Sequence, residues 1–408
     1  MAQKQVTILG STGSIGVNTL SIIENALDIF SVVGLSGFSN QELLVEQIKK
    51  FRPRYVSVKD EIAANYIREI FGSDLEVYWG AEGLVELAKQ GEIIVSAIVG
   101  FAGLQPTITA IKGGKRVALA NKESLVVAGD LIKSLIQFPG QVIPVDSEHN
   151  SIYQALSGYA ESGTTKISCA DSMTLSTDNS LDPSKYVSKI ALTASGGPFF
   201  QRTRDELKNI SPAEAIKHPR WKMGAKISVD SATLMNKGLE LIEAKNIFGV
   251  DLDKIEILIH PESIVHGFVE FIDGATLAVM YHPDMKVPIA HALSTILPER
   301  RRFYHRTTKS LNLFEVGKLN FIKPDFKRFP ALRLCYDAAL TGKSAPIVLN
   351  AANEVAVDLF LNGKIEFTRI EEIVEDALTH FDHVHVNAIS DIKLIDQNVR
   401  DDLLAGFN

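Results

Sequence analysis

The stretch VTILGSTGSIG, residues 6–16, decides how the chain begins to fold, because an apolar segment runs through a glycine-rich turn into a helical pattern. Its first four residues have the apolar and β-branched side chains of a buried strand. Gly10, Gly13 and Gly16 permit a tight turn, and the free backbone N–H groups at a helix start can hold a pyrophosphate. The GxxGxxG spacing is less specific than GxGxxG, and a simple packing turn is the alternative. Its position at the first strand–helix junction favours a dinucleotide site.

The alternation of short apolar segments and helical patterns continues through the first third of the chain. Further strands are predicted at residues 30–35, 55–58, 75–78, 93–98, 116–119 and 142–145. Short buried strands separated by helices indicate a parallel, doubly wound sheet. The second strand ends in VGLSG without the Asp or Glu that binds the ribose 2′-hydroxyl of NAD, and this absence favours NADP.

Beyond residue 153 the pattern changes. A second sheet is predicted from strands at 190–193, 255–259, 267–272 and 276–281, with helices around 232–244 and at 288–297. Later helices are expected at 331–341, 347–361 and 369–381. The polar run 158–179 predicts a loop or frayed hairpin, and the arginines at 300–302 a solvated connector.

The predicted fold class is therefore α/β, in four parts. They are an N-terminal Rossmann-like domain with a doubly wound parallel sheet (1–146), a central α+β catalytic domain (147–294), a linker (295–320) and a C-terminal helical domain (321–408).

The composition argues against several classes of protein. With 46% hydrophobic and 22% charged residues, the 408-residue chain has material for more than one globular core. The net charge of −7 argues against binding to nucleic acid or to an anionic membrane. No apolar run approaches the length of a membrane span, and the first strand begins too early to leave room for a signal peptide. Cys169 and Cys335 have neither metal-binding nor redox spacing, so a reducing cytoplasm is expected.

Two carboxylates follow the strand at 142–145, in the sequence DSEHN. Asp146 and Glu148 are two residues apart, and on extended backbone alternate side chains point the same way. Hard oxygen donors at the carboxyl end of a strand, where open α/β sheets bind ligands, predict a site for Mg²⁺ or Mn²⁺. The alternative is an Asp that caps a helix whose first turn contains a Glu.

A third carboxylate comes from the sequence SVDSATLMNKGLE. Asp230 or Ser231 is predicted to cap a helix. On that helix Asn236, Lys237 and Glu240 share a face, because they are three and four residues apart. An exposed ion pair of little consequence is the alternative. The glycine inside this helix costs about 1 kcal/mol relative to Ala, which indicates close approach by another group.

Four shorter motifs are less specific. Lys122 follows the strand 116–119 and is placed to polarise a carbonyl or pair with phosphate, unless it is a surface lysine at a capped helix. Ser195 in TASGGPF can form an anion-binding nest, although such turns are more often structural. Trp221 and Met223, in the loop HPRWKMG, predict a lid or, equally, a plug of the core. His266 is predicted to have a secondary role in the same site as the carboxylates.

These motifs, in this order, resemble 1-deoxy-D-xylulose 5-phosphate reductoisomerases. The resemblance covers nearly the whole chain and rests on GSTGSIG (10–16), LANKESLV (119–126), PVDSEHNSIYQAL (144–156), TASGGPF (193–199), HPRWKMGAKISVDSATLMNKGLELIEA (218–244), HPESIVHG (260–267) and LNAANEVAV (349–357). It implies an NADPH- and metal-dependent enzyme that isomerises and reduces 1-deoxy-D-xylulose 5-phosphate to 2-C-methyl-D-erythritol 4-phosphate, on the methylerythritol phosphate route to isoprenoids. It also implies a cytoplasmic homodimer acting on a small phosphorylated sugar.

The resemblance implies roles for individual residues as well. A divalent metal, Mg²⁺ or Mn²⁺ with Co²⁺ also compatible, is held by Asp146, Glu148 and Glu240, and Lys122 joins them as a catalytic residue. The substrate is bound by Ser147, Ser195, His218, Trp221, Ser231, Asn236 and Lys237. NADPH is bound by Gly10, Ser11, Thr12, Gly13, Ser14, Ile15, Gly16, Gly37, Ser39, Asn40, Asn121, Glu123, Met223 and Gly224.

The sequence departs from the family pattern at three places, and two other functions are alternatives to this interpretation. Ser39 replaces a basic residue found in many members, Glu262 replaces an expected glutamine, and 158–189 is a longer polar insertion. A semialdehyde dehydrogenase of similar architecture would need a nucleophilic cysteine, which neither Cys169 nor Cys335 is placed to provide. A non-catalytic NADP-binding sensor would have no use for three carboxylates, a lysine and a lid around one point.

Overall fold

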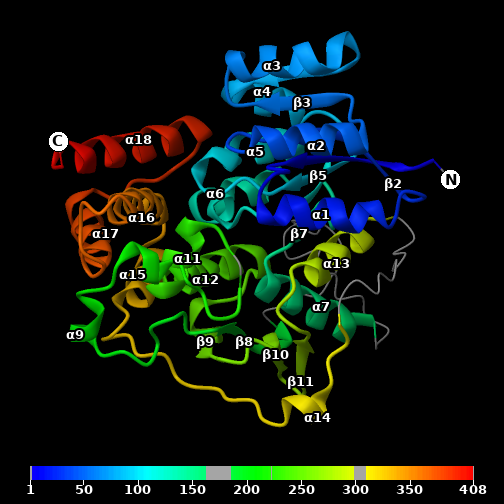
Figure 1. The fold of residues 1–408 in the computed structure, drawn as a ribbon. Coiled ribbons are helices and arrows are strands. Elements are labelled where there is room, and N and C mark those ends of the chain that lie inside the picture. Colours follow the sequence, from blue (N-terminus) through cyan, green and yellow to red (C-terminus); the bar gives the residue numbers. More distant parts are fainter. Residues whose placement is uncertain (1, 162–184, 222, 298–308, 408) are drawn as a thin grey trace.

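The computed structural model describes residues 2–161, 185–221, 223–297 and 309–407 (Figure 1). Its larger sheet has seven strands in the order β4-β3-β2-β1-β5-β6-β7, and all neighbouring strands are parallel. The predicted doubly wound sheet is therefore confirmed, with its switch point between β1 and β5, where such sheets bind ligands. The strands are β1 Lys4–Leu9, β2 Phe30–Ser36, β3 Tyr55–Val58, β4 Glu76–Trp79, β5 Ile93–Ser96, β6 Arg116–Leu119 and β7 Val142–Pro144.

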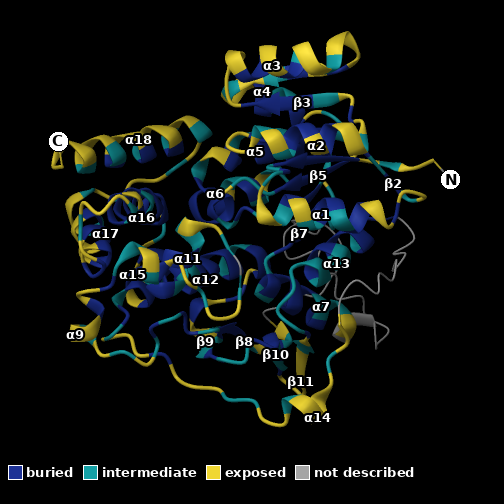
Figure 2. Ribbon diagram, in the orientation of Figure 1, coloured by how far each residue is buried: buried dark blue, intermediate teal, exposed yellow. Residues whose placement is uncertain are grey.

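Helices connect and cover these strands because each has one apolar face. They are α1 Ser14–Glu24, α2 Gln41–Phe51, α3 Glu61–Phe71, α4 Gly80–Leu87, α5 Leu104–Lys112 and α6 Lys122–Leu135. Burial follows this layering, since the strands are mostly buried, apart from the edge strand β4, and the outer faces of the helices are exposed (Figure 2). A later helix, α13 (Lys286–Ile296), returns to this layer and packs against α1, β6 and β7.

The second sheet has four strands in the order β11-β10-β8-β9. They are β8 Val187–Ala194, β9 Ile255–Ile259, β10 Val265–Phe271 and β11 Thr276–Met280. Only β8 and β9 are parallel, so the sheet is mixed. The helix α7 (Ser147–Glu161) packs on β10 and β11, and α12 (Met235–Phe248) packs on β8 and β9.

The last part of the chain is helical, as predicted. The helices α15 Pro330–Thr341, α16 Ala345–Leu361, α17 Arg369–His380 and α18 Ile389–Ala405 pack on one another and on α6 and α12. The helix α18, which buries few apolar residues, was not among the predicted helices. Shorter helices are η1 Gly72–Asp74, η2 Phe101–Gly103, α9 Arg204–Leu207, α10 Pro212–Ala215, α11 Ala225–Ala232, η4 Leu252–Lys254 and α14 Leu313–Val316.

The predicted loop 158–179 and the predicted connector around 300–302 are described only in part. The start of the polar run 158–179 is helical rather than a loop, because α7 continues to Glu161. The rest of that run, Cys169 and the arginines at 300–302 lie outside the described residues. The domain boundaries stay a prediction.

Within the described ranges, no helix combines the length and apolarity that crossing a membrane requires.

Candidate active site

The glycine-rich turn joins β1 to α1 at the switch point of the larger sheet. Gly10 has a φ of +86°, and a Cβ there would lie 2.7 Å from the carbonyl oxygen of Ala97. A Cβ on Gly16 would lie 2.4 Å from the carbonyl oxygen of Gly10. No side chain caps the start of α1 at Gly13, so the first N–H groups of the helix are available to an anion. The geometry fits a pyrophosphate.

Ser11 supports this turn from inside the protein. Its hydroxyl lies 2.7 Å from Oε1 of Gln47 and 3.0 Å from the carbonyl oxygen of Ser36, and its backbone N–H also donates to Ser36. The side-chain amide of Gln47 donates back to the carbonyl of Ser11 at 2.9 Å. Ser11 therefore shapes the turn, and its polar groups are already paired with protein atoms. Ser14 and Ile15, by contrast, line the central cavity.

The predicted contacts at the end of β2 lie beside the turn. A Cβ on Gly37 would lie 2.8 Å from the side chain of Thr12, so the two segments are in close contact. Asn40 caps α2, because its side-chain oxygen accepts from the N–H of Leu43 at 3.0 Å. Ser39 is exposed next to it. None of these residues lines the central cavity.

Asn121 and Glu123 belong to a buried polar network at the start of α6. The side-chain amide of Asn121 donates to the carbonyl oxygens of Ile98 and Gly100, at 2.7 and 2.9 Å. Glu123 pairs with Lys226 on α11 at 2.9 Å. Burial would raise the pKa of Glu123, but Lys226 outweighs it and lowers that pKa. Sequence reasoning missed Lys226, although it lies only two residues after the loop 218–224.

Three carboxylates meet where the two sheets adjoin. Oxygen atoms of Asp146, Glu148 and Glu240 all lie within 4.8 Å of one another. The prediction that the first two share extended backbone is wrong, because β7 ends at Pro144 and α7 begins at Ser147. The alternative helix-opening arrangement is the local structure, and the carboxylates converge nonetheless.

Helix packing brings these carboxylates together. A Cβ on Gly267 of β10 would lie 3.2 Å from the carbonyl oxygen of Glu148, so the glycine lets the first turn of α7 approach the sheet closely. Gly238 does the same for α12, since a Cβ there would lie 2.4 Å from Sγ of Cys335 on α15. The predicted close approach at this glycine is a helix–helix contact. The predicted cap at Asp230 or Ser231 is wrong: both lie inside α11, and Leu234, with a φ of +63°, precedes α12.

Two lysines interleave with the carboxylates. Nζ of Lys122 contacts Asp146 and lies 2.9 Å from Oε1 of Glu240. Nζ of Lys237 lies 2.7 Å from Oε1 of Glu148 and also pairs with Glu240. Burial alone would lower the pKa of Lys122, but Asp146 and Glu240 outweigh it and hold that pKa well above its ordinary value. Burial would raise the pKa of Asp146, but Lys122 holds it well below its ordinary value.

The donor set fits a hard divalent cation. Three carboxylates face two ammonium groups, so one negative charge remains for a cation to offset. Carboxylate oxygens without thiolates suit Mg²⁺ or Mn²⁺ rather than a zinc site rich in Cys and His. Two buried residues behind the ligands were missed from sequence. His149 Nε2 lies 2.9 Å from the carbonyl oxygen of Glu240, and His149 Nδ1 lies 3.5 Å from Oε2 of Glu243.

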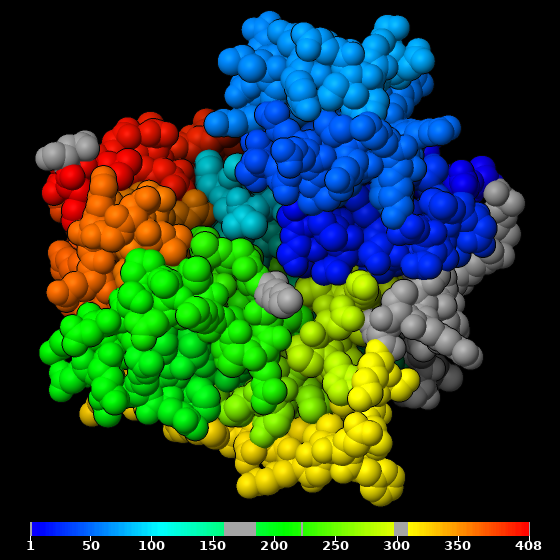
Figure 3. Space-filling model, viewed as in Figure 1, coloured from blue at the N-terminus to red at the C-terminus, as the bar shows by residue number. Residues whose placement is uncertain are grey.

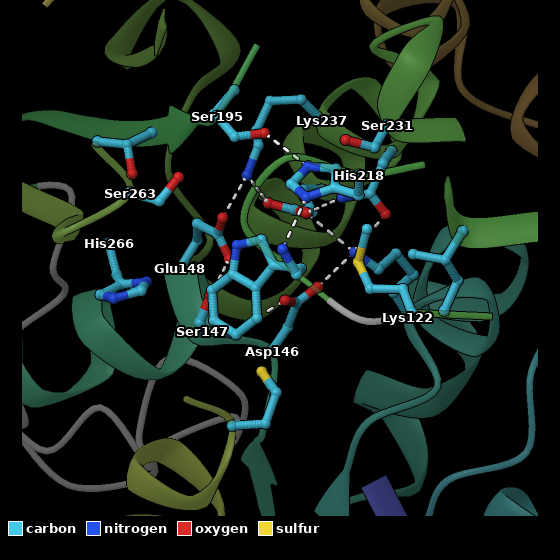
Figure 4. A pocket seen from close by; sticks show the side chains of 18 of the residues that line it. Lys122, Asp146, Ser147, Glu148, Ser195, His218, Ser231, Lys237, Ser263 and His266 are labelled. Atoms are coloured by element: carbon cyan, nitrogen blue, oxygen red, sulfur yellow. Dashed lines mark hydrogen bonds and ion pairs between the residues drawn. The ribbon is translucent and has the colours of Figure 1, made fainter. Parts of the chain in front are cut away.

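A polar subsite lies beside the carboxylates (Figure 4). Oγ of Ser195 lies 2.9 Å from Nε2 of His218 and accepts from the N–H of Gly197 at 3.1 Å. His218 Nδ1 accepts from the N–H of Trp221 at 2.9 Å, so the proton of the neutral ring is on Nε2. Burial lowers the pKa of His218 to about 4, which keeps the ring neutral at pH 7. With both acceptor positions occupied, the Ser195 hydroxyl has its own proton left for an anion.

The rest of this subsite comes from α11 and α12. A Cβ on Gly197 would lie 2.4 Å from the carbonyl oxygen of Ser231, so the turn after β8 packs directly on α11. Ser231 and Asn236 line the same cavity as Ser195. Asn236 donates to Oε1 of Glu240 at 2.5 Å and accepts from Lys122 at 3.0 Å. The hydrogen-bond donors of this polar subsite and the carboxylates are therefore neighbours.

The described residues of the loop 218–224, which exclude residue 222 and are called the flap here, form one wall of the cavity. The ring of Trp221 stands edge-on to His266, with centroids 6.0 Å apart, and Nε of Arg220 donates to the carbonyl oxygen of Pro261 at 3.1 Å. Met223 and Gly224 line the cavity together with Ser14 and Ile15 of the cofactor turn. In the space-filling view the green central part of the chain, which includes the flap, meets the blue N-terminal part (Figure 3). Trp221 faces the cavity, which matches a lid better than a plug of the core.

Glu262 is not among the residues that line the central cavity. Its carboxylate lies 3.0 Å from Nδ1 of His260 and accepts from the side chain of Asn320 at 2.5 Å. Burial would raise the pKa of Glu262, but these hydrogen bonds from Asn320 lower it. This departure from the family pattern therefore adds no carboxylate to the metal cluster.

Family models match almost the entire chain. The model for 1-deoxy-D-xylulose 5-phosphate reductoisomerase matches residues 6–129, and two models for the C-terminal domain of that enzyme match 142–248 and 280–402. The reductoisomerase of Prosthecochloris aestuarii is 48% identical over 379 residues, which cover 92% of each chain. That of Chlorobium phaeobacteroides is 46% identical over 402 residues, or 98% of each chain.

Solved structures agree with this assignment. The reductoisomerase of Zymomonas mobilis in complex with NADPH is 38% identical, with a TM-score of 0.85 over 100% of both chains. A DOX-P reductoisomerase in complex with NADPH, fosmidomycin and magnesium is also 38% identical, with a TM-score of 0.87 over 98% of both chains. The chain therefore belongs to the 1-deoxy-D-xylulose 5-phosphate reductoisomerase family.

Proposed function

We propose that this chain isomerises and reduces 1-deoxy-D-xylulose 5-phosphate to 2-C-methyl-D-erythritol 4-phosphate, with NADPH and a divalent cation, in isoprenoid biosynthesis. One observation carries the proposal. A single cavity is lined by the cofactor turn, by three carboxylates with two lysines, and by the Ser195–His218 pair. A dehydrogenase without a metal would not need the carboxylates, and a cofactor-binding sensor would need neither them nor the anion subsite.

The metal would be held by Asp146, Glu148 and Glu240, as Mg²⁺ or Mn²⁺. When bound, the cation supplies Lewis-acid polarisation of the substrate's adjacent oxygens, and NADPH supplies the hydride. Ser147 donates to Oε2 of Glu148 at 2.6 Å, which helps to fix that carboxylate. The serine would contact the substrate's oxygens near the metal. Lys122 stays protonated between Asp146 and Glu240 and would balance negative charge that develops on the substrate.

The phosphate would be bound beside the carboxylates by Ser195, Ser231, Asn236 and Lys237. His218 takes part through Ser195, whose hydroxyl proton it directs outward by donating to Oγ. Contacts to a phosphate remote from the reacting carbons supply binding energy that orients the reacting centre. Lys237 would link the phosphate to the metal site, because its ammonium already contacts Glu148 and Glu240.

The nicotinamide end of NADPH would enter between the cofactor turn and the flap. Ser14 and Ile15 on one side and Met223 and Gly224 on the other line the same cavity as Asp146. Trp221 would close the cavity over the substrate and exclude water from the reacting carbons. The pyrophosphate would rest on the turn 10–16.

The test is NADPH oxidation with 1-deoxy-D-xylulose 5-phosphate, with Mg²⁺ or Mn²⁺ and again after chelation. Metal-dependent oxidation that yields 2-C-methyl-D-erythritol 4-phosphate would support the reaction, the cofactor and the metal together. Absence of oxidation while NADPH still binds would reject the reaction and favour the sensor or a different substrate.

We further propose that the protein is a cytoplasmic homodimer without nucleic-acid or membrane partners. The dimer proposal is supported by β11, an edge strand of the smaller sheet whose residues are mostly exposed, including Leu277 and Met280. An exposed edge with apolar side chains favours pairing with another chain. Sedimentation should give twice the chain mass of 44.7 kDa, and Leu277→Lys should shift the protein toward the monomer. A monomeric wild-type protein would reject the dimer.

A further inference from the structure

Ser263 is a strained and buried residue that the proposed reaction has not used. Its φ is +53°, in the left-handed region, where few residues other than glycine are found. Only 7% of the residue is exposed, it lines the active-site cavity, and its hydroxyl has no hydrogen-bond partner among the described residues. An unpaired buried hydroxyl destabilises the folded protein, because it has lost its hydrogen bonds to water. Such a cost, together with strain, is typical of ligand sites.

The surrounding turn enforces this conformation. Nε2 of His260 accepts from the N–H groups of Ile264 and Val265, each at 3.2 Å. Nδ1 of His260 lies 2.8 Å from the carbonyl oxygen of Asn320, and the N–H of Ser263 donates to the carbonyl oxygen of His260 at 3.0 Å. The histidine therefore holds the backbone on both sides of Ser263, so the serine cannot relax to an unstrained φ without breaking these bonds.

The position of Ser263 indicates which part of a ligand it meets. Figure 4 shows it on the side of the cavity where Glu148 and His266 lie, away from Ser231. The flap also reaches this turn, because Arg220 donates to the carbonyl oxygen of Pro261, two residues before Ser263. Ser263 lines the same cavity as the carboxylates and the Ser195–His218 pair, so a ligand that spans those two groups would pass the Ser263 hydroxyl with its carbon chain.

We propose that Ser263 binds substrate directly, through a hydrogen bond between its hydroxyl and a hydroxyl or carbonyl oxygen of the substrate's carbon chain. The inference rests on the proposed function, because it takes the substrate to be a polyhydroxylated keto-sugar phosphate. A hydroxyl can donate and accept at once, which suits an oxygen-rich chain. The Ser263 hydroxyl, which is neutral, would help to orient the substrate next to the charged metal site.

The decisive variant is Ser263→Gly, because glycine adopts a positive φ without strain. It should keep or raise the melting temperature and still lose about tenfold in substrate affinity, the effect expected for one hydrogen bond. Affinity is measured by calorimetry with 1-deoxy-D-xylulose 5-phosphate and Mg²⁺, without NADPH. The NADPH affinity should not change. Ser263→Ala should lose affinity as well, with no gain in melting temperature.

The matched control is Lys343→Gly, which relieves a φ of +52° at an exposed residue between α15 and α16. It should raise the melting temperature and leave substrate affinity unchanged. Wild-type affinity in Ser263→Gly would overturn the proposal and make the strain purely structural. Because binding is measured apart from turnover, a wild-type protein that binds the sugar phosphate without oxidising NADPH would reject the proposed reaction and still decide the role of Ser263. A wild-type protein that does not bind it would reject both.

Discussion

Nζ of Lys122 lies 2.9 Å from Oε1 of Glu240, although 118 residues separate them in the sequence. Lys122 is the first residue of α6, which follows a strand of the larger sheet, and Glu240 lies on α12, which packs on the smaller one. The ion pair therefore joins the two layers at the metal cluster. Substitutions on either side should disturb the metal site without disturbing the cofactor turn.

Glu240→Gln should abolish metal-dependent turnover and retain NADPH binding. The loss should exceed about 100-fold, because changes to the outer partners of metal ligands already cost 10–100-fold. Turnover across a Mg²⁺ titration and NADPH fluorescence measure the two properties. Glu256→Gln, in an exposed pair with Lys189, is the control and should behave as wild type. Near-normal turnover in Glu240→Gln would remove this residue from the ligand set.

Lys122→Met should destabilise the metal-free protein and make its melting temperature more sensitive to Mg²⁺. The substitution leaves Asp146 without its ammonium partner, while Glu240 keeps its pair with Lys237. Breaking a buried pair in this way costs about 3–5 kcal/mol. In the wild type the lysines already offset most of this charge, so added Mg²⁺ should raise its melting temperature less. Equal responses to Mg²⁺ in both proteins would argue against charge compensation by Lys122.

His218 should make folding stability depend on pH between about 4 and 6.5. Its folded-state pKa is about 4, against 6.5 for an unperturbed histidine, so the unfolded chain binds the proton more readily in this window. The contribution is complete above pH 6.5 and is lost as the pH falls through 4. His218→Gln should flatten the melting-temperature profile there. His266, whose pKa is also lowered to about 4, is present in both proteins and cancels in the difference.

Alanine substitutions at two glycines of the cofactor turn should have different effects, one on stability and the other on NADPH binding. A Cβ at Gly16 would lie 2.4 Å from the carbonyl oxygen of Gly10 and 2.5 Å from Cα of Ser11, so Gly16→Ala should lower the melting temperature. At Gly13 the nearest atom is 3.4 Å away, so Gly13→Ala should fold normally. It should nonetheless weaken NADPH binding, because the new methyl group stands where the pyrophosphate approaches α1. Full NADPH affinity in Gly13→Ala would place the pyrophosphate elsewhere.

Gly238→Ala should destabilise the protein by about 1–3 kcal/mol, as overpacking of a core does. Its new methyl group would lie 2.4 Å from Sγ and 2.7 Å from Cβ of Cys335. Denaturant unfolding measures the loss, and Cys335→Gly in the same chain should restore part of it. Additive losses in the double variant would show that the two helices do not compete for this space.

The sequence predicted the larger sheet well because its strands are short, apolar and separated by helices. The strand 55–58 and the strand 116–119 have the predicted bounds. The polar helix α18 was missed because only Ile392, Asp396 and Val399 are buried along it. Apolar periodicity, the signal that predicts a helix, is weak when so little of the helix faces the core.

The site was predicted where ligand chemistry is visible in local motifs, and missed where long-range packing creates it. Asp146 and Glu240 carry such motifs, and the structure brings them together. Lys226 and Ser263 have no distinctive spacing. Their importance comes from a partner 103 residues away in one case and from a positive φ in the other, neither of which periodicity reveals.

Because α13 packs on the larger sheet, this layer can be completed only after residue 296 has been translated. This helix spans Lys286–Ile296 and covers α1, β6 and β7, yet the last strand of that sheet ends at Pro144. At about 5–20 residues per second, a ribosome needs on the order of ten to thirty seconds to make the intervening chain. During that interval the apolar surface that α13 covers stays open to other proteins. The first layer to be translated is thus among the last to be completed.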